Sequence, residues 1–438
     1  MKKEMEIKLN LDSLCVYKWI FDNNIGDKFK ILVDKILFNG DIREIIKCYN
    51  NFAYELFSLK GSRSFREMIV HEMLVNNNPF YNNLSNEESE IEILIESLRN
   101  ELSYLEAISN INSNVIKEIV LEKCEDDVLF NRVKGLINWG TNKESYIAKG
   151  LIDFEVLKEK LINNNNWGSY AEEILEFHKV NGTGRSTAYK AFVWERFENE
   201  EEGHLREVAE PDPITLKELV GYEFQKKDII KNTEQFLKGI PANNLLLYGS
   251  RGTGKSSTVK ALLNEYYNDG LRLIEVDKEQ LGDFTRIIRL LKGKKQKFII
   301  FVDDLVFAEN EQSYSALKTI LEGRVENRPD NIIIYATTNR KHLVKEKFSD
   351  RDDVHSKDTK EEQLSLADRF GMTISFYAPN QNEFLEIVDG IVESKGINVD
   401  KDYLHSEALK WEKWNNGRSP RSARQFINWL EGELSINK

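Results

Sequence analysis

The sequence predicts an α/β protein, in which a three-layer αβα domain is built around a parallel sheet of five strands. A mainly helical region precedes this domain and a small helical domain follows it. Short apolar runs alternate with helix-length segments from residue 214 onward, which is the pattern of successive strand–helix–strand units. A glycine-rich loop follows the first run, and polar residues directly follow later runs, at the sheet edge where such folds place their ligands.

The size and charge of the chain limit what it can be. Its 438 residues exceed one ordinary domain and suggest roughly two to four. A net charge of −12 makes the surface as a whole a poor match for nucleic acid or an anionic membrane, although a local basic patch could still exist. No run of ~18 apolar residues is present, so we expect no membrane insertion.

Cysteine and histidine usage indicates a reducing compartment without a structural metal. Cys15, Cys48 and Cys124 are odd in number and form no C-x-x-C pair, which favours free thiols in the cytoplasm. The six histidines show no metal-ligand spacing. Charged residues interrupt the apolar stretch that a signal peptide would need near the N-terminus. We therefore expect a cytoplasmic protein.

Residues 1–205 are predicted to be mostly helical and to bind a partner or pack on the rest of the chain. The apolar-periodic runs are 29–38, 42–59, 65–75, 91–108 and 115–121, with Asn110, Asn112 and Asn114 as candidate caps. We interpret Gly182-Thr183-Gly184 as a turn before an aromatic core element, rather than a second phosphate loop. Periodicity leaves open whether that element is a helix or a strand. The acidic and proline-containing stretch 198–213 is the expected linker.

Five apolar runs are expected to form the parallel sheet. They are residues 245–248, 271–276, 298–302, 332–336 and 373–377. Helices are expected before the first of them, at 225–238, and between them after the glycine-rich loop, at 278–291 and around 313–321. Continuous apolar runs of this length are typical of parallel strands that are buried on both faces.

The glycine-rich loop, residues 249–256, fits the pattern G-x-x-x-x-G-K-[ST]. Its glycines let the backbone curl so that several N–H groups point at one anion, and the helix that follows adds the positive end of its dipole. Lys255 would reach the β- and γ-phosphates, and the Ser256 hydroxyl would ligate Mg²⁺. The alternative is a turn without a ligand. The expected phosphate-binding residues are Gly249, Ser250, Arg251, Gly252, Thr253, Gly254, Lys255, Ser256 and Ser257.

Polar residues at two further strand ends complete a candidate catalytic site. Asp303 is placed to ligate Mg²⁺ together with Ser256, and Asp304 to polarise an attacking water. Asn339, at the end of another strand, could orient the same water. The alternatives are a strand-end helix cap for Asp303, an exposed turn acid for Asp304 and a turn asparagine for Asn339.

These motifs together resemble the AAA+ ATPases over roughly residues 206–435. The stretch 244–257 looks like Walker A, 298–304 looks like Walker B, and Asn339 looks like sensor 1. The segment around Arg369 resembles the one that carries the arginine finger; the alternative is an intrachain salt bridge of Arg369. Arg421 resembles sensor 2, with Arg424 one turn later as the second candidate.

The resemblance implies more than the residues alone. Val220 would lie in the stretch that contacts adenine, residues 206–378 would form the P-loop NTPase domain, and residues 379–438 would form the lid with sensor 2. ATP and Mg²⁺ would be the ligands. The arginine finger of AAA+ proteins comes from a neighbouring subunit, which implies a ring, most often a hexamer. A narrower resemblance is to a bacterial AAA+ family labelled domain of unknown function 815, which implies ATP binding and names no substrate.

One departure from the AAA+ pattern concerns the rate. Asp304 stands where the family has a catalytic glutamate, one methylene longer. A displacement of about an ångström can cost on the order of 100-fold in rate. We therefore expect hydrolysis to be slow and ATP binding to be unaffected.

Three functions remain open at this stage. The first is an ATPase that remodels or loads a protein or nucleic-acid client through residues 1–205. The second is an ATP-dependent assembly switch or scaffold in which hydrolysis is incidental. The third is a P-loop kinase acting on a small molecule, against which Arg421 and Asn339 argue.

Overall fold

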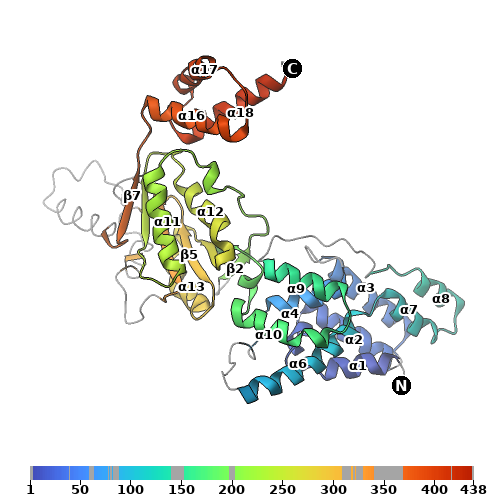
Figure 1. Ribbon diagram of the computed structural model, residues 1–438. Coiled ribbons are helices and arrows are strands. Elements are labelled where there is room, and N and C mark those ends of the chain that lie inside the picture. Colours follow the sequence, from blue (N-terminus) through green and yellow to red (C-terminus); the bar gives the residue numbers. More distant parts are fainter. Residues whose placement is uncertain are drawn as a thin grey trace, which may run out of the picture. The chain divides into compact units, whose positions relative to one another are not determined.

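A computed structural model of the chain is shown in Figure 1. It describes residues 3–38, 40–58, 64–76, 78, 81, 88–139, 152–196, 203–307, 317–318, 321, 329–339, 368–415 and 417–436. Contacts between residues divide the chain into two compact units, Met1–Ala188 and Tyr189–Lys438. The expected helix around 313–321 falls largely outside the described residues.

The first unit is helical, as predicted (Figure 1, blue to green). Its longer helices are α1 (Lys3–Asp12), α2 (Asn24–Leu37), α3 (Ile42–Ser58), α4 (Phe65–Val75), α6 (Glu88–Ser109), α7 (Ser113–Leu121), α8 (Asp127–Lys134), α9 (Ile152–Asn163) and α10 (Ala171–Asn181). Of the three candidate caps, Asn112 caps α7, because its side chain accepts the amides of Asn114 and Val115 at 3.0 and 3.2 Å.

An aromatic cluster forms part of the core of the first unit. The ring centroids of Phe29 and Phe65 lie 4.7 Å apart, those of Phe52 and Phe65 5.3 Å, and those of Phe52 and Trp139 5.2 Å. All four side chains are at most 1% exposed. Because large buried aromatic side chains contribute much of a core's apolar area, this unit has a core of its own.

The second unit contains a seven-stranded sheet. The strands are β1 (Ala191–Glu195), β2 (His204–Glu207), β3 (Leu245–Gly249), β4 (Leu271–Glu275), β5 (Lys297–Val302), β6 (Ile332–Thr338) and β7 (Met372–Phe376). Their order is β2-β1-β4-β5-β6-β3-β7, and every neighbouring pair is parallel except β1 and β2. The five expected strands form the parallel run from β4 to β7.

The predicted count of five strands is wrong, because β1 and β2 extend the sheet. Strand β1 answers the question that periodicity left open: the aromatic element is a strand, paired with β4 through registers such as Phe192↔Ile274. The turn before it is as interpreted, with positive φ at Gly182 and Gly184. Strand β2 lies inside the acidic stretch that was expected to be a linker. Its own sequence does not signal a strand, and its extended conformation comes from antiparallel pairing with β1.

Three layers result from the alternation of side chains along the strands. On β5, Ile299 and Phe301 belong to one apolar cluster, whereas Phe298 and Ile300 belong to another. Successive residues of a strand point to opposite faces, so these clusters cover the two faces of the sheet. Helices α11 (Glu223–Leu237) and α12 (Lys255–Tyr266) contribute to the first cluster, and α13 (Phe284–Leu291) contributes to the second. The predicted helix 278–291 begins as a 3₁₀ turn, Lys278–Asp283.

Three helices follow the sheet and have their own apolar cluster: α16 (Gln381–Lys395), α17 (Lys401–Trp414) and α18 (Pro420–Ile436) (Figure 1, orange to red). Asn380 and Glu383 form a capping box at the start of α16, and Gly396 ends this helix with φ +65°. The expected domain boundaries after residues 205 and 378 remain predictions, and β1 with half of β2 lies before the first of them. Among the described helices, none is long and apolar enough to cross a membrane.

Candidate nucleotide-binding site

The glycine-rich loop connects β3 to α12 at the carboxyl edge of the sheet. Gly249 has φ +140°, and a Cβ atom there would lie 1.9 Å from the main-chain oxygen of Phe376 on β7. The same oxygen accepts the amide of Ser250 at 2.9 Å. Only glycine fits between the two strands at this point, because any side chain would collide with the backbone of β7. The close approach of the β7 backbone therefore fixes the point at which the loop leaves β3.

Lys255 begins α12 and lies inside the loop. Its Nζ donates to the carbonyl oxygens of Gly249 and Ser250 at 2.9 and 2.8 Å, and to Oδ1 of Asn339 at 3.1 Å. Burial lowers the pKa of the Lys255 ammonium from 10.5 to about 8, although the nearby carboxylates of Asp303 and Asp304 oppose that shift. All three acceptors are neutral oxygens, and an ammonium group forms stronger hydrogen bonds with the charged oxygens of an anion.

Ser256 and Asp303 meet across the cavity from different elements. The hydroxyl of Ser256, in the first turn of α12, donates to Oδ1 of Asp303, at the end of β5, at 2.6 Å. Hydroxyl and carboxylate oxygens are hard ligands of the kind that Mg²⁺ prefers, and Mg²⁺ sites usually combine one or two carboxylates with phosphates. The described residues contain no group of three or more His, Cys, Asp or Glu side chains that could form an all-protein metal cage. The donor set therefore fits Mg²⁺ bound together with a nucleotide.

Asn339 connects Lys255 to Asp304. Its Nδ2 donates to Oδ1 of Asp304 at 2.7 Å, while its Oδ1 accepts from Lys255. An ammonium only donates and a carboxylate only accepts, so this orientation of the amide satisfies both partners. Asp304, Asn339 and Lys255, which were predicted from three separate motifs, therefore form one hydrogen-bonded chain.

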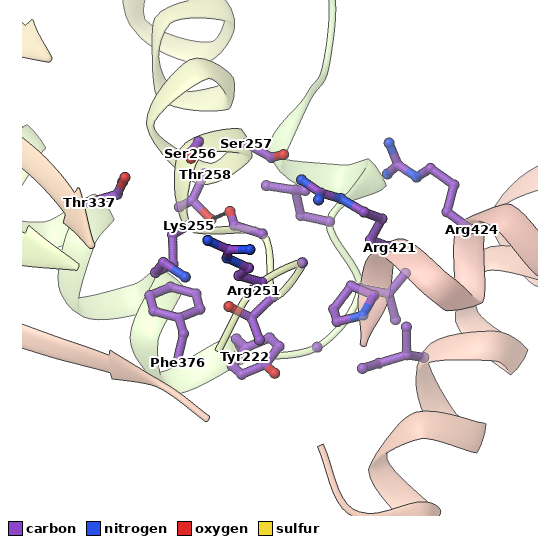
Figure 2. Close-up of a pocket in the computed structure, with 18 of the residues that line it drawn as sticks. Tyr222, Arg251, Lys255, Ser256, Ser257, Thr258, Thr337, Phe376, Arg421 and Arg424 are labelled. Atoms are coloured by element: carbon purple, nitrogen blue, oxygen red, sulfur yellow. Dashed lines mark hydrogen bonds between the residues drawn. The ribbon is translucent and has the colours of Figure 1, made fainter. Parts of the chain in front are cut away.

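Two arginines of α18 reach the site from the small helical domain (Figure 2). The amide of Arg421 donates to the carbonyl oxygen of Gly252 in the loop at 3.1 Å, and Nη2 of Arg424 donates to the carbonyl oxygen of Glu218 at 3.1 Å. Both side chains line the same cavity as Lys255. The sequence left open which of the two serves as sensor 2, and the structure places both beside the loop.

The cavity has a volume of about 490 Å³. Its lining includes most of the predicted site residues: Val220, Arg251, Gly252, Thr253, Gly254, Lys255, Ser256, Ser257, Asp303, Asp304, Asn339, Arg421 and Arg424. Gly249 and Ser250 lie at the start of the loop and do not line it. The cationic residues of the lining are Lys226, Arg251, Lys255, Arg421 and Arg424, and the acidic ones are Glu218, Asp303 and Asp304. This excess of positive charge favours a polyanion.

The lining also has apolar residues: Val220, Tyr222, Phe376, and Ile387 and Ile391 of α16. Val220 packs with Ile387 and Ile391 in the apolar cluster of the small helical domain, and Tyr222 packs with Phe376 in a cluster of the sheet. Sequence reasoning missed Phe376 and both isoleucines, because apolar residues on a strand or helix carry no sign of which cavity they will line. It also gave no role to Lys226 or Thr337, both of which line the cavity. Thr337 could have been noticed from its place beside Asn339 at the end of an apolar strand.

Arg369 does not line this cavity. It lies just before β7, whereas Phe376, at the other end of that strand, is a lining residue. A strand of five residues spans roughly 16 Å, at ~3.3 Å per residue. Arg369 therefore lies at the amino ends of the parallel strands, whereas the loop of its own chain lies at their carboxyl ends.

Residues 150–434 match the sequence model of the family described as Protein of unknown function (DUF815). The chain belongs to this family. This match and the curated relatives confirm the predicted AAA+ membership and the predicted resemblance to the DUF815 family. The match extends into the first unit, from residue 150, and leaves residues 1–149 outside it.

The curated relatives are distant. The proteasome-activating nucleotidase of Saccharolobus islandicus is 26% identical over 277 residues, covering 57% of this chain and 64% of the relative. That of Aeropyrum pernix is 27% identical over 276 residues, covering 57% and 61%. The chain thus spans less than two thirds of these relatives. Among solved structures, the Holliday junction branch migration motor RuvB of Thermotoga maritima is similar with a TM-score of 0.35 and 19% identity, over 51% of this chain and 66% of that one.

Proposed function

We propose that this DUF815 protein binds MgATP in the cavity beside the loop and hydrolyses it to ADP and phosphate. The observation that carries the proposal is the hydrogen-bonded network of Lys255, Ser256, Asp303, Asp304 and Asn339 within one cavity. These side chains come from α12 and from the ends of β5 and β6. They supply the charge neutralisation and positioning that phosphoryl transfer requires.

Each residue then has a chemical role. Lys255 binds the β- and γ-phosphates, while Ser256 and Asp303 hold Mg²⁺, which when bound would neutralise charge on the phosphate oxygens. Asp304 accepts a proton from the attacking water, and its hydrogen bond from Asn339 fixes the direction of its carboxylate. Arg421 and Arg424 add positive charge from the lid side. Val220 and the other apolar lining residues accept the base.

The place of Arg369 supports an oligomer. Because this side chain lies at the far edge of the sheet, it can meet a phosphate only in the cavity of another copy of the chain. A ring, with six copies as the expected number, gives every cavity one such arginine. An arginine in this role is worth roughly 10³- to 10⁵-fold in rate.

The client is a macromolecule, protein or nucleic acid, that residues 1–205 recognise, and the expected location remains the cytoplasm. Because the curated relatives are covered only in part, their activities and partners do not transfer with the match. A second candidate is an ATP-dependent assembly switch with incidental hydrolysis. The observation that favours it is the short carboxylate of Asp304 in place of glutamate.

Turnover measured on matched variants tests the proposal. We expect Asp304→Asn to keep ATP affinity within about twofold and to lower the rate of phosphate release at least about 100-fold, since it removes the base and preserves the shape of the side chain. Lys260→Ala, on the same helix as Lys255 but outside the cavity, should leave both values unchanged. Undiminished phosphate release by Asp304→Asn would rule out the assigned base.

A further inference from the structure

The turn that follows β5 has an unusual backbone. Asp304 has φ +49°, and the described non-glycine residues that share a positive φ are Asn166 and Tyr222. Side chains generally disfavour this left-handed region, in which aspartate and asparagine are the tolerated exceptions because a short polar group can form local hydrogen bonds. Glutamate has no such advantage. The backbone at this position therefore discriminates between the two acids.

Thr337 on β6 holds this turn from the neighbouring strand. Its Oγ1 accepts the amide of Asp304 at 3.0 Å, and its carbonyl oxygen accepts the amide of Leu305 at 2.7 Å. Its hydroxyl proton is donated to Oδ1 of Asp303. Thr337 is only 2% exposed, so competition from water is weak. One residue thus fixes the two peptide groups on either side of the Asp304 α-carbon and orients the Asp303 carboxylate.

The same strand fixes the carboxylate of Asp304. Asn339 stands two residues after Thr337, and residues two apart on a strand face the same side. Its amide donates to Oδ1 of Asp304 at 2.7 Å. Oδ1 of Asp303 accepts from Ser256, from Thr337 and from the amide of Asp304, and none of these bonds uses Oδ2. Thr337 and Asn339, at the end of β6, therefore orient the carboxylates of Asp303 and Asp304.

We propose that the left-handed turn is matched to aspartate, so that Asp304 is the correctly placed base of this chain and not a weakened glutamate. Thr337 is its positioning residue. This inference rests on the proposed hydrolysis, and it reverses the expectation from the sequence that one missing methylene slows the reaction. A longer side chain on this backbone would carry its carboxylate past the amide of Asn339.

The kinetic test compares Asp304→Glu, Thr337→Val and Thr337→Ser with the natural chain. Asp304→Glu should lower kcat about tenfold or more, with ATP affinity within about twofold. Thr337→Val keeps the shape and removes the hydroxyl, so it should also lower kcat about 10- to 100-fold at little changed KM. Thr337→Ser restores the hydroxyl and should recover most of the rate. Equal or faster turnover by Asp304→Glu, or full activity of Thr337→Val, would overturn the proposal.

A second readout does not depend on hydrolysis. Glycine and asparagine tolerate a left-handed backbone, so Asp304→Gly and Asp304→Asn should melt at or above the temperature of the natural chain, whereas Asp304→Glu should melt about 1 to 3 °C below it. Asp304→Glu melting above Asp304→Asn would overturn the proposal. If the natural chain releases phosphate no faster than Lys255→Ala, the proposed function fails, and this melting order still decides whether the turn is matched to aspartate.

Discussion

The charge state of Lys255 should control how ATP affinity depends on pH. Burial lowers the pKa of this ammonium to about 8, and a bound polyphosphate would raise it again. With a pKa near 8, roughly three quarters of the molecules carry the charge at pH 7.5 and about 3% do at pH 9.5. Because the charged form binds phosphate, the Kd for MgATP should rise about 20- to 30-fold over this interval.

Calorimetric titration with MgATP at half-unit pH steps measures this change. ATP itself has lost its last phosphate proton at the lower end of the interval, so it contributes little. Lys255→Arg is the matched control, because a guanidinium stays charged throughout and its pH profile should be nearly flat even if its affinity is lower. A constant Kd for the natural chain, or the same rise in Lys255→Arg, would refute the assignment of Lys255.

The charge state of Lys255 should also affect folding stability, and in the opposite direction: stability rises with pH where ATP affinity falls. The pKa of Lys255 is lower in the folded chain than its ordinary value of 10.5, so the unfolded chain binds more protons between pH 8 and 10.5. The contribution of this group to the free energy of unfolding of the ATP-free protein therefore rises with pH in that window. With saturating MgATP this contribution should shrink or reverse, and chemical denaturation at several pH values would show which occurs.

Three further predictions concern other parts of the site. Arg369→Ala should reduce turnover about 10³-fold or more with an unchanged Kd for MgATP; equal loss of both would exclude an action from a neighbouring copy. Gly390→Ala places a methyl group 2.6 Å from Cγ1 of Val220, so it should weaken ATP binding about tenfold. Binding of tripolyphosphate, which has no base, should stay unchanged. Calorimetry with both ligands tests this, and a parallel loss of both affinities would contradict a base subsite at Val220. Gly249→Ala should cost about 2 to 4 kcal/mol of unfolding free energy, whereas Gly239→Ala, with no atom within 4 Å, should cost less; similar losses in denaturant unfolding would contradict the predicted collision.

The sequence predicted those parts of the fold that local patterns encode. The apolar runs of β3 to β6 contribute buried residues to both faces of the sheet, so each stands out as a continuous segment between turns, whereas β7 contributes to one face only. The loop around Lys255 was predictable because its glycines, lysine and serine follow from the needs of phosphate binding. Asp303, Asp304 and Asn339 could be named because parallel strands bring their carboxyl ends to one edge.

The missed features depend on contacts between distant segments. Strand β2 has only four residues and an alternating exposure, and its pairing with β1 decides its conformation. The role of Thr337 comes from hydrogen bonds across 33 and 34 residues of sequence. The left-handed backbone of Asp304 lies among these bonds, so the sequence alone predicted slow hydrolysis, whereas we propose a base that is matched to its turn.

The central claim is that Lys255 and its neighbours bind a triphosphate with Mg²⁺. Calorimetric titration of the natural chain and of Lys255→Ala with MgATP at pH 7.5 tests it most directly. We expect a one-site isotherm for the natural chain and at least about a tenfold loss of affinity for the variant. Absence of binding heat at millimolar nucleotide, together with no shift in melting temperature, or equal affinity of both proteins, would contradict the claim.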